Sequence, residues 1–236
     1  MRQLLRFITI ASLFLFASSG FAAAYNYTKE DLSGYNLQPD LELAGSAAPE
    51  SDYSRNGHDI YFEAGYLFTH VFFLNSNVTA YAGSNSLNYT PTSVFQSNYS
   101  GFHIGIGKEL SRRFDAQLRY LQVFTQSKTT GNQSGSYKFQ EVLLDIGLVL
   151  NPDSQCQVSL LGGGAFSQYY INISSSGTSY QPQQSLSEVN PAVGAGIAVF
   201  MTQSLAFRLS TLYISDLQKV TSNGNINVLA GLSYNV

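Results

Sequence analysis

The sequence is poor in cysteine, tryptophan and charge. Its 236 residues include one cysteine, Cys156, and no tryptophan. A single cysteine excludes a disulfide framework and any metal site built from several cysteines. Charged residues make up 11% of the chain, well below the roughly 25% of soluble domains, yet hydrophobic residues reach only 44%. This balance argues against a helical membrane protein and against an ordinary cytosolic enzyme.

Clustered positive charge is also missing. The formal net charge is -3, so composition gives no case for binding nucleic acid, which needs gathered lysine and arginine. In place of charges the chain carries 20 Gly, 16 Tyr and 16 Phe, with many uncharged polar residues. Such a mixture suits strands with one apolar and one wet face.

Long apolar runs are absent except at the N-terminus. Two arginines precede an apolar run at residues 7–17, and Ala22, Ala23 and Ala24 supply a small-residue cleavage pattern. This is the order of a secretory signal, which predicts a signal peptide over 1–24. An uncleaved anchor needs about 20 apolar residues, and Ser18 and Ser19 interrupt the run too early.

Residues 25–57 show no periodicity and contain six acidic side chains against two basic ones. Low hydrophobicity with an excess of one charge predicts a flexible acidic tail, placed in the periplasm. The remaining residues, 58–236, form the folded part.

From residue 58 onward, apolar residues recur at every second position. The alternating segments cover about 60–72, 101–110, 114–125, 141–150, 157–167, 193–201, 205–216 and 225–236. They are longer than the usual strand of 5 or 6 residues and match the roughly 9–11 residues with which a tilted strand crosses a bilayer. The sequence therefore predicts eight membrane-spanning strands.

The connections between these segments alternate in length. Long ones cover about 73–98, 126–136, 172–187 and 217–224, and short ones cover 111–113, 151–154 and 202–204. Short periplasmic turns alternating with longer outer loops are typical of outer-membrane barrels. In hydrocarbon every backbone group must be paired, so the strands must close on themselves. We predict an all-β fold: an antiparallel up-and-down barrel of eight strands with a lumen filled by side chains rather than an open channel.

The last segment alternates Val228, Ala230, Leu232 and Tyr234 and ends at Val236, where such barrels usually carry an aromatic residue. With this strand and the alternating connections, residues 58–236 resemble the small eight-stranded outer-membrane barrels of the OmpA/OmpX/opacity type, the outer membrane protein β-barrel domain. The resemblance implies a protein of the bacterial outer membrane, in contact with its lipid and lipopolysaccharide and inserted by the barrel-insertion machinery. It also implies a periplasmic N-terminal tail and C-terminus.

Three histidines, His58, His70 and His103, are the candidates for acid–base chemistry. His103 faces inward, and we expect it near the outer rim of the second strand. Some barrels of this size modify lipid A, so a lipid A-modifying enzyme using His103 is the alternative function. No metal or cofactor site is predicted, because the histidines are scattered and the cysteine is alone.

The main hypothesis is a non-enzymatic outer-membrane protein with a structural or surface-interaction role, as an adhesin or in envelope integrity. The outer loops at 73–98 and 172–187 are uncharged and rich in Ser, Thr, Asn and Tyr, which suits adaptable hydrogen bonding to a host or surface ligand. A soluble secreted barrel of lipocalin type is a third hypothesis.

A charge cluster is predicted in the periplasmic half of the lumen. Its members share the inward-facing parity of their strands: Glu63, Glu109, Arg119, Asp145 and Arg208. A hairpin folded about residue 131 brings Arg119 near Asp145. The turn at 112–113 places Glu109 opposite Asp115 or Gln117, which leaves Arg208 to find a partner across the lumen, with Glu63 as the candidate.

Overall fold

A computed structural model describes residues 59–182, 187–219 and 221–236. The signal peptide predicted over 1–24 and the tail predicted over 25–57 lie outside the described residues, and both remain predictions.

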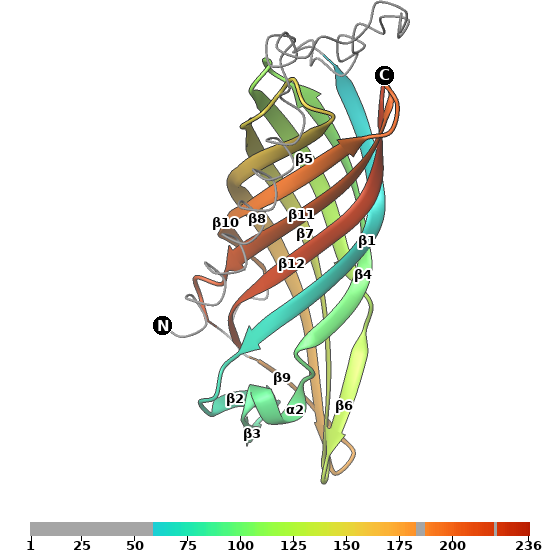
Figure 1. The fold of residues 1–236 in the computed structure, drawn as a ribbon. Coiled ribbons are helices and arrows are strands. Elements are labelled where there is room, and N and C mark those ends of the chain that lie inside the picture. Colours follow the sequence, from blue (N-terminus) through green and yellow to red (C-terminus); the bar gives the residue numbers. More distant parts are fainter. Residues whose placement is uncertain (1–58, 183–186, 220) are drawn as a thin grey trace, which may run out of the picture. The chain divides into compact units, whose positions relative to one another are not determined.

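Eight long strands form the wall of a closed antiparallel barrel (Figure 1). They are β1 (Ile60–Phe73), β4 (Asn98–Glu109), β5 (Phe114–Val123), β7 (Gln133–Val149), β8 (Cys156–Ser175), β10 (Ser187–Phe200), β11 (Leu205–Ser215) and β12 (Ser222–Asn235). Each pairs with the next in this order, and β12 pairs back with β1 from Tyr61 opposite Asn235 to Phe73 opposite Ser222. The predicted fold class and strand number are confirmed.

The two longest strands extend well past their predicted outer limits. β7 has 17 residues and β8 has 20, and they stay paired from Gln133 opposite Ser175 to Val149 opposite Ser159. In their outer ends the inward residues stay apolar, as with Tyr137, Phe139, Ile171 and Ile173, but the opposite face is mostly polar because it meets water and not lipid. Pairing and one buried apolar face together define these strands outside the membrane.

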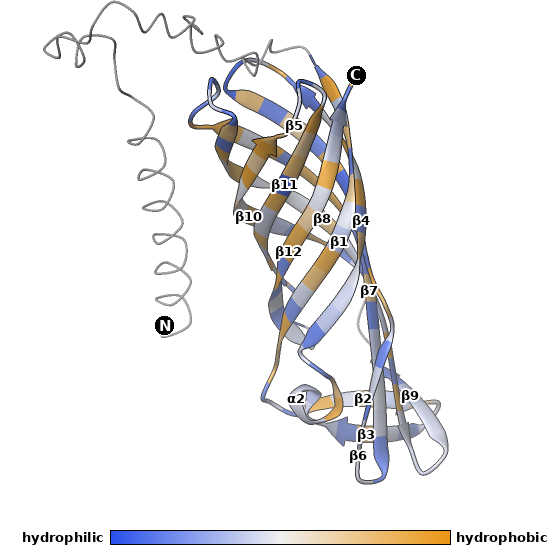
Figure 2. Cartoon of the chain, turned by 45° about the vertical axis from the view of Figure 1, so that its right-hand side comes forward, coloured by the Kyte–Doolittle hydropathy of each residue, from blue (hydrophilic) through white to orange (hydrophobic). Residues whose placement is uncertain are grey.

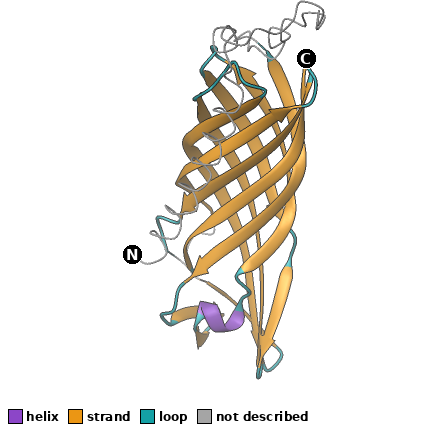
Figure 3. Cartoon of the chain, viewed as in Figure 1, coloured by secondary structure: helices purple, strands orange, loops and turns teal. Residues whose placement is uncertain are grey.

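Regular elements also occupy three of the four long connections, which were expected to be loops (Figure 3). They are β2 (Val78–Ala82), β3 (Asn85–Tyr89), α2 (Pro91–Val94), β6 (Gln126–Thr130) and β9 (Thr178–Pro182). Two-residue turns join β2 to β3, β6 to β7 and β8 to β9, and each contains a glycine with positive φ: Gly83, Gly131 and Gly177. Such turns match the twist of paired strands, which is why these connections fold as hairpins.

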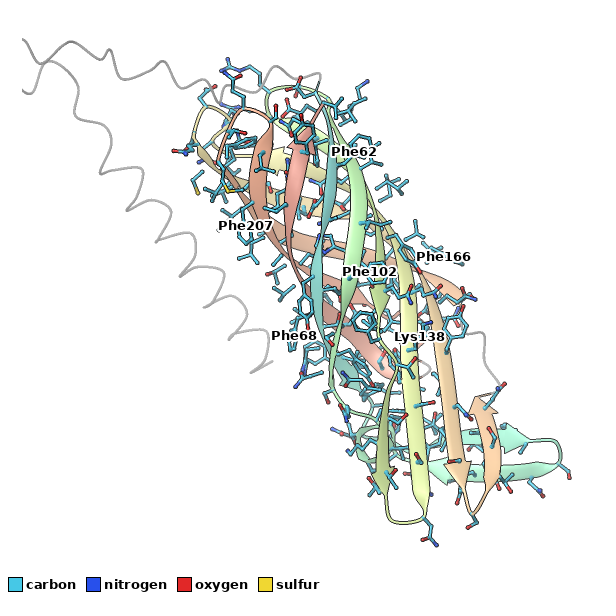
Figure 4. The ribbon with its side chains drawn as sticks, turned by 90° about the vertical axis from the view of Figure 1, so that its right-hand side faces the viewer. Phe62, Phe68, Phe102, Lys138, Phe166 and Phe207 are labelled. Carbon is cyan, nitrogen blue, oxygen red and sulfur yellow. The ribbon has the colours of Figure 1, made fainter. Side chains whose placement is uncertain are left out.

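The barrel wall has an apolar outer belt and a packed interior. Along β7, Leu144 on the outward face is 59% exposed, while its neighbour Leu143 is fully buried. Bands of apolar colour alternate along the barrel strands, whereas β3 and β6 are pale or polar (Figure 2). The labelled Phe62, Phe166 and Phe207 point away from the wall (Figure 4). This belt is the surface that contacts lipid.

In the part of the chain that the structure describes, no helix has the length and hydropathy needed to cross a membrane.

Aromatic side chains fill the end of the lumen opposite the short turns. Tyr137 of β7 lies 5.1 Å from Phe73, 5.7 Å from Phe95 and 5.4 Å from Tyr99, measured between ring centroids. Phe95 follows α2, so the first long connection folds inward over the mouth. Together these rings close the lumen, and we call them the aromatic stopper.

Candidate functional site

The lumen near the short turns holds a buried ion pair. Arg119 on β5 donates to Asp145 Oδ2 on β7, from Nη2 at 2.7 Å and from Nε at 3.2 Å. Both side chains are at most 1% exposed. The two residues are diagonal neighbours, because Asp145 is directly opposite Gln117 and Arg119 is opposite Leu143. Gly105 on β4 makes room for the arginine, since a Cβ there would lie 2.8 Å from Arg119 Cγ.

His103 lies in the middle of the barrel wall and not near the outer rim, so the predicted position is wrong. The prediction failed because β4 begins at Asn98, further out than the predicted start. His103 Nε2 lies 3.0 Å from Glu63 Oε1, and His103 is fully buried. Gly65, directly opposite on β1, leaves room for the imidazole.

The surroundings of His103 do not favour catalysis. Ser100 lies three residues away on the same strand, so its side chain points to the opposite face of the wall. Tyr99 shares the inward face but packs against Tyr137 in the aromatic stopper. Ser100 therefore cannot serve as a nucleophile beside this histidine, and the geometry gives the lipid A-modifying alternative no support.

Arg208 on β11 is not paired with Glu63, which corrects the predicted contact. Its guanidinium carbon lies 3.9 Å from the centroid of the Tyr61 ring, and its Nε donates to Ser233 Oγ at 2.8 Å. Glu63 is turned toward His103 instead. The cross-lumen partner was wrong because it depends on how far neighbouring strands are staggered around the whole barrel, which one hairpin does not fix.

Glu109 and Asp115 complete the group of charged side chains in the lumen near the short turns. They lie directly opposite each other on β4 and β5, and each is 2% exposed. The Tyr61 hydroxyl donates to Asp115 Oδ2 at 3.5 Å. The structure therefore places all five predicted residues in the part of the lumen near the short turns, but it divides them among separate contacts.

The sequence did not reveal a second polar network, which lies in the lumen further from the short turns. Glu141 of β7 is fully buried and accepts hydrogen bonds from Ser167 Oγ at 3.0 Å and from Asn225 Nδ2 at 3.1 Å on one oxygen. Its other oxygen accepts from Asn227 Nδ2 at 3.2 Å, and Thr69 Oγ1 donates to Asn227 Oδ1 at 2.6 Å. The signal was present as inward polar residues on β7 and β12, but nothing in the sequence indicated that they meet.

This network continues into the last long connection, residues 216–221. Pairing of β10 with β11 ends at Ala192 opposite Ile214, next to Pro191, which has no N–H to continue the ladder. Beyond that point, lumen side chains hold the connection. The Leu217 N–H donates to Asn190 Oδ1 at 3.1 Å, and the Gln218 N–H donates to Glu188 Oε2 at 3.4 Å. We call these contacts the loop latch.

Asp216 anchors the same connection from within. Its carboxylate accepts from the Lys219 N–H and from Ser222 Oγ, each at 2.7 Å. Burial is the main cause that raises the pKa of Asp216 to about 6, and the charge of Glu188 raises it further. We therefore expect protonation of Asp216 near pH 6 to affect the latch.

The three ordered connections together build a sheet outside the membrane. Its strand order is β3-β2-β9-β8-β7-β6, formed by β2, β3, β6, β9 and the outer ends of β7 and β8. We call it the outer sheet. One face is packed, with Ala80, Val94 and Ile173 each fully buried. Gly135 on β7 allows α2 to approach, because a Cβ there would meet Val94 Cγ1 at 2.3 Å.

No group of three or more His, Cys, Asp or Glu side chains suited to a metal ion occurs among the described residues. Cys156 is exposed on the wall and unpaired.

The closed wall, the apolar belt and the filled lumen define an integral outer-membrane β-barrel protein. A family model, the outer membrane protein beta-barrel domain, matches residues 78–235, and the chain belongs to this family. The predicted resemblance is therefore confirmed.

Solved structures support the same architecture. The attachment invasion locus protein Ail of Yersinia pestis aligns with 17% identity and a TM-score of 0.51, over 76% of this chain and 99% of that one. The outer membrane protein OprG of Pseudomonas aeruginosa aligns with 8% identity and a TM-score of 0.53, over 78% of this chain and 98% of that one. At these identities the likeness concerns the fold alone. A comparison with curated proteins gives no match.

Proposed function

We propose that this protein is a non-enzymatic outer-membrane barrel that presents the outer sheet for contact with other surfaces. The observation that carries the proposal is that the long connections form regular, packed structure. Loops that only link strands have no need of a core, yet here Tyr89, Val94 and Phe95 are buried at 2% exposure or less. A rigid display surface is the kind of platform on which recognition sites are built.

Differences between the two ends of the barrel support an orientation in the membrane. The short turns lie at the same end as the start of β1 and the C-terminus (Figure 1). There the Val236 N–H donates to the Ile60 carbonyl at 2.8 Å. We place this end in the periplasm and the outer sheet outside the cell, as in other barrels with short periplasmic turns. The belt then contacts outer-membrane lipid and lipopolysaccharide, after insertion by the barrel-insertion machinery.

The test expresses the full chain in a Gram-negative host without fibre adhesins and measures adherence to host cells and to neighbouring bacteria. In one variant a short Gly-Ser turn replaces residues 78–89, which removes β2 and β3 from the outer sheet. In the control variant the same turn is inserted at residues 202–203, in a short turn at the other end. We expect adherence to rise with the intact protein and with the control, and to fall to the vector level without β2 and β3.

Heat-modifiable gel migration shows whether each variant has a folded barrel. Adherence that never exceeds the vector level, with folded protein in the outer membrane, would overturn the proposed contact role.

A further inference from the structure

The packed outer sheet has a second face that is open to solvent and nearly uncharged. Register places one cross-strand row of hydroxyls on it, consisting of Thr129, Ser134, Ser174 and Ser179 on four successive strands. A neighbouring row pairs Ser127, Ser136 and Asn172 on β6, β7 and β8, and a separate paired group holds Gln181, Tyr81 and Ser86 on β9, β2 and β3. These two rows define what we call the polar face.

The polar face is open to solvent. Tyr81 is 41% exposed, and the other members are exposed or half-buried. With strands about 4.8 Å apart, the four strands of the first row make it roughly 14 Å across. This spacing is close to the length of one pyranose residue along an extended chain, so the face can accommodate several successive sugars.

Charge is nearly absent from the outer sheet. None of its described residues is Asp or Glu, and its two cations are Lys128 and Lys138. The Lys128 ammonium is turned to the packed side, where it donates to the Thr92 carbonyl at 3.1 Å. The Lys138 ammonium lies over the Tyr170 ring at 5.6 Å, at the end of the sheet nearest the belt (Figure 4). The polar face itself therefore offers only hydroxyls, amides and a tyrosine.

The face is also held in place. Ser179 Oγ donates to Asn172 Oδ1, and Thr129 Oγ1 donates to Ser134 Oγ at 3.3 Å. A surface that is ordered before binding loses less conformational entropy when a ligand arrives.

We propose that the polar face binds a neutral polysaccharide chain carried by another surface. This inference rests on the proposed contact role and names its ligand class. Sugars present hydroxyls that both donate and accept, together with C–H faces that stack on aromatic rings, and the polar face supplies the matching groups. An anionic polysaccharide would lose its ionic hydration and find one cation on this side of the sheet, Lys138, which lies over Tyr170 at the end nearest the belt. A protein partner would need an apolar centre to its interface, which this face lacks.

The position of the face favours a ligand from outside over the cell's own lipopolysaccharide. Ser136 lies four residues beyond Gln140 along β7, about 13 Å further from the belt at 3.3 Å per residue. Ser134 and Ser174 lie still closer to the hairpin tips. The face therefore meets what approaches the cell.

The experiment uses the full folded protein in lipid nanodiscs made without lipopolysaccharide, on an array of glucans, mannans and galactans. Dextran and dextran sulfate form a pair that differs only in charge. Tyr81→Ala and Ser136→Glu test the face, and Gln203→Ala, in a short turn at the other end, is the matched control. We expect saturable binding to at least one neutral chain, weakened about tenfold by Tyr81→Ala, a factor worth about 1.4 kcal/mol.

Binding only to dextran sulfate, or to no neutral chain, would overturn the inference, as would equal binding by the face variants and Gln203→Ala. Retained binding in Tyr81→Ala with loss in Ser136→Glu would still support it. A bound sugar chain would cover the introduced carboxylate, and removing that charge from water opposes binding. If the arrayed sugars fail but a purified protein of the contacted surface binds, the partner is a protein and the inference is wrong. Because the array does not measure adherence, it can fail while the contact role stands.

Discussion

The ion pair between Arg119 and Asp145 makes a strong prediction about stability. Arg119→Ala removes two hydrogen bonds to Asp145 Oδ2 and leaves that carboxylate buried at 0% exposure without its cation. Breaking a buried pair in this way costs about 3–5 kcal/mol, most of which is the penalty of the stranded charge. Against the 5–15 kcal/mol of a typical domain, such a loss is a large fraction of the stability.

The control is Arg113→Ala, which removes the same side chain from an exposed position in a short turn. Urea unfolding of the protein in lipid vesicles gives the midpoint, followed by far-UV circular dichroism because the chain has no tryptophan for fluorescence. We expect Arg119→Ala to lower the midpoint clearly and Arg113→Ala to leave it nearly unchanged.

A second variant isolates the stranded charge. Arg119→Met combined with Asp145→Leu replaces both partners by apolar residues of similar size, and such replacements are often neutral. We expect the double variant to recover much of the loss. If Arg119→Ala and Arg113→Ala unfold at the same midpoint, or if the double variant is as unstable as Arg119→Ala alone, the argument from burial is refuted.

Three further predictions concern packing, conduction and pH. Gly107→Val should lower the unfolding midpoint and disturb the stacking of Arg208, because a Cβ at Gly107 would lie 2.1 Å from Tyr61 Cζ; unchanged stability would contradict this reading. The purified protein should give no stable conductance in planar bilayers, since the aromatic stopper fills the outer lumen, and reproducible large channels would count against it. The raised pKa of Asp216 means that the folded state favours the protonated form, so this group stabilises the loop latch at acid pH and less as pH rises through about 6. Hydrogen exchange at residues 217–219, corrected for the intrinsic base dependence, should therefore speed up between about pH 4 and 6, and Asp216→Asn should remove that step; a step that persists in the variant would refute the role of Asp216.

The sequence predicted the barrel well where one face of each strand meets lipid. There, alternation such as Leu143 and Leu144 follows directly from the two environments of the wall. It stopped short in the outer ends of β7 and β8, where buried Tyr137, Phe139, Ile171 and Ile173 continue the alternation but the opposite face meets water instead of lipid and is mostly polar. Hairpin register was predictable only approximately: the turn between Thr130 and Gln133 fixes the pairing of β6 with β7, but the pairing of β5 with β7 is shifted from it by one residue, so that Arg119 lies opposite Leu143.

Contacts across the lumen were not predictable in the same way. The partner of Arg208 and the meeting of Glu141 with Asn225 both depend on the stagger accumulated around eight strands. No local pattern encodes that stagger. The sequence also did not reveal that the outer connections are packed, because their core combines residues that are distant in the chain, such as Val94 with Gly135.

The seam between β1 and β12 has a consequence for biogenesis. Thr69 and Asn227 are 158 residues apart in the chain, yet their side chains are 2.6 Å apart across this seam. Until β12 is in place, the free edge of β1 exposes unpaired backbone groups that hydrocarbon does not tolerate. Insertion must therefore wait for the last strand, or another protein must shield the open edge in the meantime. The order of synthesis thus makes the final hairpin a checkpoint, and a ribosome that stalls before β12 leaves a product that no stretch of membrane can accept.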